Sequence, residues 1–157
     1  MNVIVSDSTT IITLLNIDRV DILKNVFTKV YLPLRVYDEI VIEENIKLDK
    51  KFFIQKEIKD KEFYSILLKS LDSGECEAII LAQEMNLSLI IDEKKGRKIA
   101  HNLGINIFGF IGLLILNYKN NFLSQKEVID VFYQAKKEGF RVSKKLEKDF
   151  LEIVSQV

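Results

Sequence analysis

The sequence predicts an α/β fold around a parallel sheet, because short apolar strand patterns alternate with helical patterns along most of the chain. The first apolar run, Val3 to Val5, holds only β-branched residues, and a run without alternation is typical of a strand buried on both faces. This run ends at Asp7-Ser8 and leads directly into a helical pattern. The same strand, turn and helix order repeats from Lys29 onward, which is the pattern expected of parallel strands.

The N-terminal half contains two strand–helix units and then an irregular stretch. In each unit a short strand candidate is followed by apolar residues spaced three and four positions apart. Pro33 suits the first turn of the second helix, where its missing N–H costs no hydrogen bond. Residues 43–61 are charged and weakly patterned, so we expect irregular structure there with at most a short extended piece at 52–55. The predicted elements are, in order, a strand at 2–6, a helix at 10–27 that Ser8 or Thr9 can cap, a strand at 29–32, and a helix from Pro33 with Val36, Tyr37, Ile40 and Val41 on one face.

The C-terminal half continues the alternation and ends in helices. Asn86 and Gly104 precede apolar strands and are suitable stop signals for the helices before them, since both residue types adopt the left-handed conformation that ends a helix. The predicted elements are, in order, helices at 62–71 and 73–86, a strand at 87–91, a helix at 93–103, a strand at 105–108, and helices at 111–118, 124–138 and 143–154.

Composition limits the class of protein. The 157 residues fit one domain, and the 23 basic residues balance 23 acidic ones, so a binding surface for nucleic acid must be local. The single Cys76 cannot form an internal disulfide, and the start of the chain lacks a signal-peptide pattern. The longest uncharged apolar run, residues 105–118, is shorter than the roughly 18 to 20 residues that span a bilayer. We therefore expect a cytoplasmic protein without a membrane segment.

Two acidic residues follow predicted strands. Asp7 and Asp92 stand at strand ends, and in open parallel sheets the functional crevice lies outside the carboxyl ends of the strands. A carboxylate hidden there needs hydrogen bonds, a charge partner or a cation, and no basic residue is close to Asp7 in the sequence. A metal ion is one explanation. The other is that Asp7 or Ser8 only caps the first helix.

A third acid lies at the start of the 73–86 helix. Helical spacing places Glu75 on the same face as Ala78 and Ala82, which points inward, and the positive end of the helix dipole favours its charged form. Glu77 lies on another face and is interpreted as a first-turn charge that complements the helix dipole. A slightly different helix start would exchange the two roles.

The helix after Pro33 offers two more acids. Asp38 and Glu39 flank its apolar face on opposite sides, so periodicity does not choose between them. Both are also explained as solvated surface charges.

The basic run from Lys94 to Lys98 follows Asp92 almost immediately. Such a run can receive the phosphate backbone of a nucleic acid, and it is equally explained as an ordinary solvated helix face. His101 is expected at the surface, and Cys76 is expected to pack as a small apolar residue.

Taken together, the four acids and their neighbours resemble the PIN-domain family. The likeness is closest to VapC-like proteins with a Gly-Glu-x-Glu-Ala-Ile helix, and it extends to residues 104–109 and 139–143. The segments that carry it are Val-Ser-Asp7-Ser-Thr, Pro33-Leu-Arg-Val-Tyr-Asp-Glu39-Ile, Gly74-Glu75-Cys-Glu-Ala-Ile and Leu-Ile-Ile-Asp92-Glu.

This resemblance implies a three-layer α/β/α sandwich with a central parallel sheet and extra C-terminal helices, as one domain over residues 1–157. It selects Glu39 over Asp38 and implies that Asp7, Glu39, Glu75 and Asp92 are catalytic. Family members bind Mg²⁺ or Mn²⁺ through such acids, which suits the preference of these hard cations for oxygen ligands. The implied metal ligands are Asp7, Glu75 and Asp92.

The implied activity is metal-dependent hydrolysis of RNA phosphodiester bonds by an endoribonuclease. Thr9, Lys94 and Lys98 are the expected substrate contacts. Relatives of this branch are commonly toxins held inactive by a small antitoxin protein, and they commonly form homodimers, so both properties are expectations here. The rival hypothesis is a PIN-like module that binds RNA or a protein with little catalysis, and such a module would tolerate the loss of Asp7.

Overall fold

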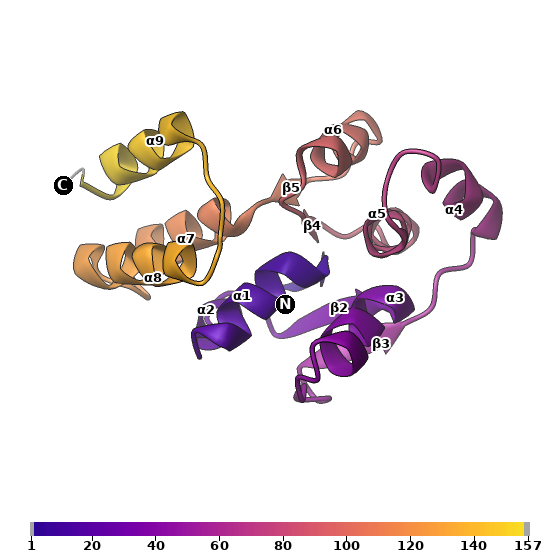
Figure 1. Cartoon of the computed structure of the whole chain (residues 1–157), viewed down its shortest axis with the longest axis horizontal. Helices are drawn as coiled ribbons and strands as arrows, with labels where there is room; N and C mark the ends of the chain where they lie inside the picture. Colours follow the sequence, from indigo (N-terminus) through magenta and orange to yellow (C-terminus); the bar gives the residue numbers. More distant parts are fainter. Residues whose placement is uncertain (1, 156–157) are drawn as a thin grey trace.

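A five-stranded parallel sheet forms the centre of the protein in the computed structural model, which describes residues 2–155 (Figure 1). The strand order is β3-β2-β1-β4-β5, so β1 lies in the middle. Ser6 of β1 pairs with Ile90 of β4, and the carboxyl ends of these two strands therefore lie side by side. The strands are β1 (Val3–Ser6), β2 (Lys29–Pro33), β3 (Phe53–Lys56), β4 (Leu89–Ile90) and β5 (Ile107–Phe108).

Helices complete the predicted three-layer α/β/α arrangement. Helix α5 packs against β1, β2 and β4, whereas α7 packs against β5, α8 and α9. Figure 1 shows α7, α8 and α9 grouped together, on the opposite side of the molecule from α4. The helices are α1 (Ser8–Asn16), α2 (Asp21–Lys24), α3 (Leu34–Asp38), the π-helical turn η1 (Glu39–Glu43), α4 (Lys61–Leu67), α5 (Ser73–Met85), α6 (Lys94–Asn102), α7 (Phe110–Lys119), α8 (Gln125–Lys137) and α9 (Lys144–Ser155).

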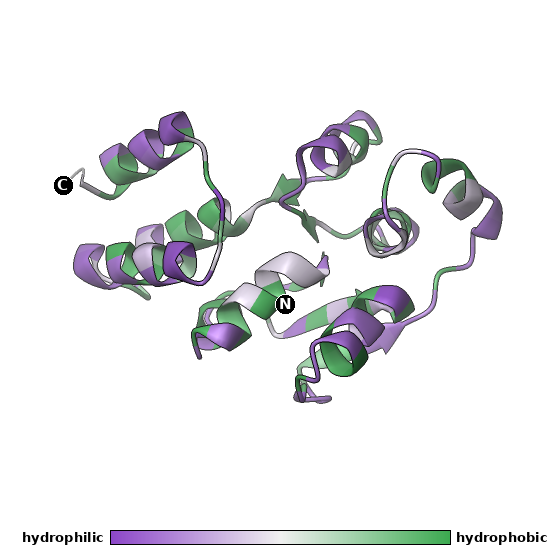
Figure 2. Cartoon of the chain, in the orientation of Figure 1, coloured by the Kyte–Doolittle hydropathy of each residue, from purple (hydrophilic) through white to green (hydrophobic). Residues whose placement is uncertain are grey.

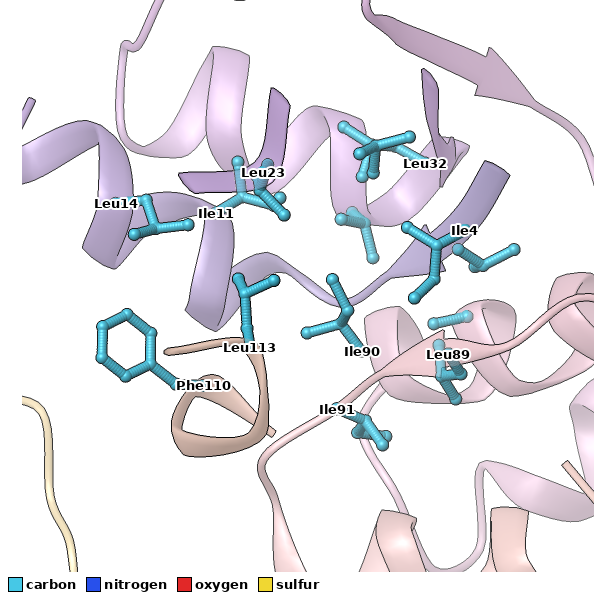
Figure 3. Close-up of a cluster of buried hydrophobic side chains, with 14 of the residues drawn as sticks. Ile4, Ile11, Leu14, Leu23, Leu32, Leu89, Ile90, Ile91, Phe110 and Leu113 are labelled. Carbon is cyan, nitrogen blue, oxygen red and sulfur yellow. The ribbon is translucent and has the colours of Figure 1, made fainter. Parts of the chain in front are cut away.

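The core joins the central strands to these helices. Ile4 of β1 and Ile90 of β4 are fully buried, together with Ile11 of α1 and Leu113 of α7 (Figure 3). Burial of apolar side chains such as these is the main favourable term in folding. Figure 2 shows α7 as mostly hydrophobic, whereas α8 and α9 each combine hydrophobic and hydrophilic sides. No helix between residues 2 and 155 combines the length and apolar character needed to cross a membrane.

The predicted continuous helix over residues 10–27 is wrong. Helix α1 ends at Asn16, and the chain reverses through Asp18, whose φ is +57°. Asp tolerates this left-handed conformation better than most residues. The N–H of Arg19 donates to the carbonyl of Leu14 at 2.8 Å, and a separate short helix, α2, follows. Apolar residues keep helical spacing across this turn, which explains why the sequence pattern did not show it.

The stretch predicted as irregular, residues 43–61, contains the edge strand β3. It pairs in parallel with β2, with Val30 opposite Phe53, so the short extended piece expected at 52–55 is a true strand shifted by one residue. Ahead of this stretch, the helix that starts after Pro33 widens at Glu39 into η1, where the N–H of Glu44 donates to the carbonyl of Glu39 at 3.0 Å. Such π-helical turns are frequent at functional sites.

A candidate metal-binding carboxylate site

Asp7 is a buried acid directly after the central strand. Its backbone N–H donates to Ile90 at 2.9 Å, which fixes it beside the end of β4, and only 4% of the residue is exposed. Oδ2 accepts from the backbone N–H of Asp92 at 3.2 Å, but Oδ1 is buried without a hydrogen-bond partner within residues 2–155. Although Asp7 stands at the start of α1, its side chain makes no capping hydrogen bond. Helix capping therefore does not explain this residue.

The charge of Asp7 is unfavourable in this position. Burial raises its pKa well above the ordinary value, and the negative charges of Asp92 and Glu75 raise it further. The backbone N–H groups of Asp92 and Thr10 lower the pKa again, but only in part. The N–H of Thr10 lies near the Asp7 carboxylate without forming a capping hydrogen bond to it. A buried charge that lacks compensation is a feature that a bound cation would relieve.

Glu39 enters the site from η1. Its Oε2 accepts a hydrogen bond from the hydroxyl of Ser8, and partial burial raises its pKa while this bond lowers it. The carboxylate lies so close to Gly74 that a Cβ added there would stand 2.3 Å from Glu39 Oε1. Glycine at position 74 therefore leaves the space that the Glu39 carboxylate occupies.

Glu75 faces the same space from the first turn of α5. Its N–H donates to Asp72 at 2.8 Å, and its own Oε1 accepts from the Asp72 N–H at 3.4 Å, which together form a capping box. Burial, followed by the negative charge of Asp72, raises the pKa of Glu75 from 4.5 to about 8, and the charge of Glu93 contributes as well. The predicted helix start at Ser73 and stop at Asn86 are both confirmed.

The interpretation of Glu77 as a first-turn charge that complements the dipole of its own helix is wrong, because of these two acids only Glu75 lies in the first turn of α5. Its side chain is buried, and Oε1 accepts from the backbone N–H of Arg35 at 2.9 Å. Arg35 belongs to the first turn of α3, so Glu77 satisfies a free N–H at the start of that helix. Glu77 is buried because α3 packs on α5, and the spacing of residues along α5 alone does not predict this contact.

Asp92 joins Asp7 from the neighbouring strand end. Beside the backbone contact to Asp7, its Oδ2 accepts from the buried hydroxyl of Thr10 at 2.8 Å and its Oδ1 from the N–H of Phe110 at 3.0 Å. Phe110 opens α7, whose positive end favours a carboxylate there. Gly109 permits this approach, because a Cβ at that position would lie 2.6 Å from Asp92 Oδ1.

Three of the four predicted acids line one small cavity of about 150 Å³, which we call the carboxylate pocket. Asp92 is not among its lining residues and instead borders two larger hollows alongside. The carboxylate pocket is lined by Asp7, Ser8, Thr9, Glu39, Asp72, Gly74, Glu75 and Glu93.

Two of these acids were not predicted as site residues. Asp72 and Glu93 accept hydrogen bonds at the starts of α5 and α6, Glu93 from Gly96 at 2.7 Å. Their place before helical patterns predicts a cap and nothing more. Their positions in the sequence could have indicated a place in the site, because Glu93 directly follows Asp92 and Asp72 stands three residues before Glu75.

The predicted substrate contacts differ in whether they line a cavity beside the acids. Thr9 is exposed and lines the carboxylate pocket, and Lys94 lines a hollow that Asp92 borders. Lys98 is exposed on α6 but is not among the residues that line these cavities. As expected, Cys76 is buried and His101 is exposed.

The donor set fits a hard divalent cation. Every acid at the site offers carboxylate oxygens, and the buried Oδ1 of Asp7 has a free lone pair. Within residues 2–155 no three His, Cys, Asp or Glu side chains are already grouped as a complete ligand set. Mg²⁺ does not require one, because it usually keeps several waters and binds through one or two carboxylates.

Gly74→Ala tests the close approach of Glu39. Alanine favours helix by roughly 0.5–1 kcal/mol over glycine, so the variant should fold at least as stably. Its Cβ displaces the Glu39 carboxylate, and a misplacement of about 1 Å can cost on the order of 10²-fold in rate. We expect divalent-metal affinity and metal-dependent activity to fall at unchanged melting temperature. Gly104→Ala, at a helix end where a Cβ meets nothing, is the opposite control: it should lose stability through its φ of +79° and keep activity.

Comparisons with known proteins agree with this architecture. A family model, DUF3368, described as a PIN domain, matches residues 3–156. Among solved structures, a PilT N-terminus domain protein from the hyperthermophilic archaeon Sulfolobus solfataricus P2 is similar, with 22% sequence identity and a TM-score of 0.55 over 75% of this chain and 94% of that chain. At this identity the likeness shows a shared fold. No protein of curated function matches the chain.

Proposed function

Because the chain belongs to the PIN-domain family, whose members are typically nucleases, we propose that it is an Mg²⁺- or Mn²⁺-dependent endoribonuclease. The proposed ligands of the cation are Asp7, Glu75 and Asp92, with Glu39 as a fourth catalytic acid. Family membership supports a nuclease in general. The choice of metal, of RNA and of these residues is the proposal.

One observation carries the proposal furthest, namely the buried Oδ1 of Asp7 without a hydrogen-bond partner in the described chain. Leaving such a group unsatisfied costs roughly 1–3 kcal/mol, and more for a charged group. The sequence keeps an acid there although a neutral residue would avoid this cost. A cation bound at Oδ1 would offset this cost, which explains why an acid stands at this position.

Hydroxyl and backbone groups of the chain orient the proposed ligands. Ser8 holds Glu39, while Thr10 and the Phe110 N–H hold both oxygens of Asp92. Glu75 has to release the proton that its raised pKa favours before it can act as a ligand. Its Oε1 accepts from the Asp72 N–H, and its Oε2 is not used in that contact. When bound, a divalent ion lowers the pKa of a bound water and offsets the charge of the leaving oxygen.

The same proposal includes a biological role as the toxin of a toxin–antitoxin pair, with a small antitoxin protein as partner and a homodimer as the working form. The support for this role is that the segment from Gly74 through Ile79, with the other segments named above, resembles VapC-like proteins. Growth arrest on expression, relieved by an adjacent small protein, would support this role.

Metal-dependent cleavage is the test of the nuclease. We expect binding of Mg²⁺ or Mn²⁺ by calorimetry, cleavage of a mixed RNA pool with either ion, and no cleavage in EDTA. Asp92→Asn should lose about 10²-fold or more in rate, as expected when a group that stabilises the transition state is removed. Asp38→Asn is the matched control, because Asp38 does not line the carboxylate pocket.

One observation favours a second function: within the described residues the acids are not already grouped as a complete set of metal ligands. It is a module that binds RNA or a protein without cleaving it. Cleanly folded wild type that binds no divalent ion and cleaves no RNA, yet retains RNA binding in EDTA, would favour this second function over the nuclease.

A further inference from the structure

A second, larger hollow opens beside Asp92. It has a volume of about 670 Å³ and lies between α6, the start of α7 and the connection from α8 to α9, which Figure 1 shows passing the start of α7. We call it the cationic hollow, after Lys94, Arg97 and Arg141, which line it together with Asp92. It shares no lining residue with the carboxylate pocket, and the two are linked through Asp92, which lines the hollow and whose N–H donates to Asp7 of the pocket.

The charges of the cationic hollow are available to a ligand. Arg141 is exposed and makes no hydrogen bond or ion pair within residues 2–155. Arg97 uses Nη1 to donate to the carbonyl of Ile91 at 3.3 Å, which leaves its other N–H groups free of that contact. The only acid in the lining, Asp92, already accepts from Thr10 and Phe110. Three cations against one occupied carboxylate favour an anionic ligand.

The rest of the lining is largely apolar. Phe108 and Ile115 are only partly buried and border the cationic hollow. Phe140 also lines the hollow, and its ring packs on Phe110 with centroids 4.7 Å apart, which ties the connection from α8 to α9 to the start of α7. A ligand that fills this space must combine negative charge with a flat or apolar body.

We propose that the cationic hollow binds one unpaired nucleotide of the RNA strand, next to the phosphate that the acids cleave. Its phosphate contacts Arg141 and Lys94, and its base packs against Phe108 and Phe140. Bases of a duplex are stacked inside the helix and cannot enter such a hollow, so the substrate is single-stranded at this position. This inference rests on the proposed nuclease function and adds a positioning subsite to it.

Binding measured without cleavage tests this inference. The probe is fluorescein-labelled octauridylate, followed by anisotropy in EDTA over a salt titration, beside a blunt duplex of equal length. Arg141→Gln should weaken binding about tenfold and reduce the salt slope by about 0.7, the value for one lost phosphate contact on a single strand. Phe108→Leu should weaken binding severalfold through lost stacking while the salt slope stays unchanged. Lys119→Gln, an exposed cation elsewhere on α7, is the matched control and should bind like wild type.

Several results would overturn the inference. These are wild type that does not bind the octamer, equal affinity for the duplex, wild-type binding by Arg141→Gln, or an equal loss in Lys119→Gln. If Phe108→Leu instead changes the oligomeric state in sedimentation, the hollow is an interface between copies and not a nucleotide subsite.

The nuclease and the subsite can fail independently. Cleavage by wild type with unaltered binding in the hollow variants would reject only the subsite. Binding that depends on Arg141 without any metal-dependent cleavage would reject only the nuclease.

Discussion

Asp7→Asn should strongly slow RNA cleavage and at the same time stabilise the metal-free protein. The carboxylate is the proposed central ligand, so its loss should reduce the rate by on the order of 10³-fold. In the absence of metal, Asp7 is a buried acid with one unsatisfied oxygen and two acidic neighbours. A neutral amide avoids the cost of burying that charge. The expected gain in unfolding free energy near pH 8 is roughly 1–3 kcal/mol.

The pH dependence gives this prediction a second readout. Because the folded-state pKa of Asp7 is raised above 3.8, the folded protein holds a proton that the unfolded chain releases. The unfolding free energy of metal-free wild type should therefore fall as pH rises from about 4 toward the raised pKa, by at most about 1.4 kcal/mol per unit for one group. Glu75, with a pKa of about 8, extends the fall in the same direction up to that pH. Asp7→Asn should show a shallower fall.

Urea unfolding in EDTA at pH 5 and pH 8 measures both effects, with cleavage assays run on the same preparations. Saturating Mn²⁺ should reverse the wild-type trend, since the ion binds the deprotonated acids, and should leave Asp7→Asn nearly unaffected. A variant less stable than wild type at pH 8 in EDTA would contradict the picture of Asp7 as an uncompensated charge.

Glu75→Gln and Glu77→Gln should have opposite consequences although the two changes are chemically identical and two residues apart. Gln at position 75 can still complete the capping box, so the fold should be retained while cleavage falls by about 10²-fold or more. Gln at position 77 can still accept from the Arg35 N–H, though without charge, so this variant should lose about 0.5–1.5 kcal/mol in stability and keep its activity.

Melting temperatures and single-turnover cleavage of the two variants separate these outcomes. Metal titrations at pH 6 and pH 8 add a check on Glu75, because protons compete with the ion below its pKa of about 8 and wild-type affinity should rise over this interval. If cleavage is lost in Glu77→Gln and kept in Glu75→Gln, the two residues have exchanged the roles assigned here.

Much of the fold follows from local pattern. The central strand β1 is recognisable as a run of β-branched residues, and β4 lies within a near-continuous apolar stretch. Asp7 and Asp92 could be chosen because they directly follow these two stretches in the sequence. Asn86 and the capping residues at Asp72 and Glu75 likewise mark both ends of α5 through their own backbone preferences. The break after Asn16 was missed because it depends on one residue, Asp18, in the left-handed conformation.

The rest of the site depends on contacts between distant segments. Spacing leaves Asp38 and Glu39 equivalent, and their difference arises from the wider turn of η1 and from the space that Gly74 leaves on α5. Glu77 is buried because the start of α3 packs against it, and a helical wheel of α5 alone cannot predict this contact. Arg141 lies 49 positions after Asp92 in the sequence and reaches the same hollow through the connection from α8 to α9.

The central place of β1 has a consequence for protein synthesis. Asp7 is made early, but the neighbours that complete its surroundings, Ile90, Asp92 and Phe110, leave the ribosome only about 80 to 100 residues later, which takes several seconds at about 5–20 residues per second. A nascent chain that ends before Phe110 lacks the contact that orients Asp92. Translation therefore delivers the acids one by one, and their surroundings are complete only after Phe110 has left the ribosome.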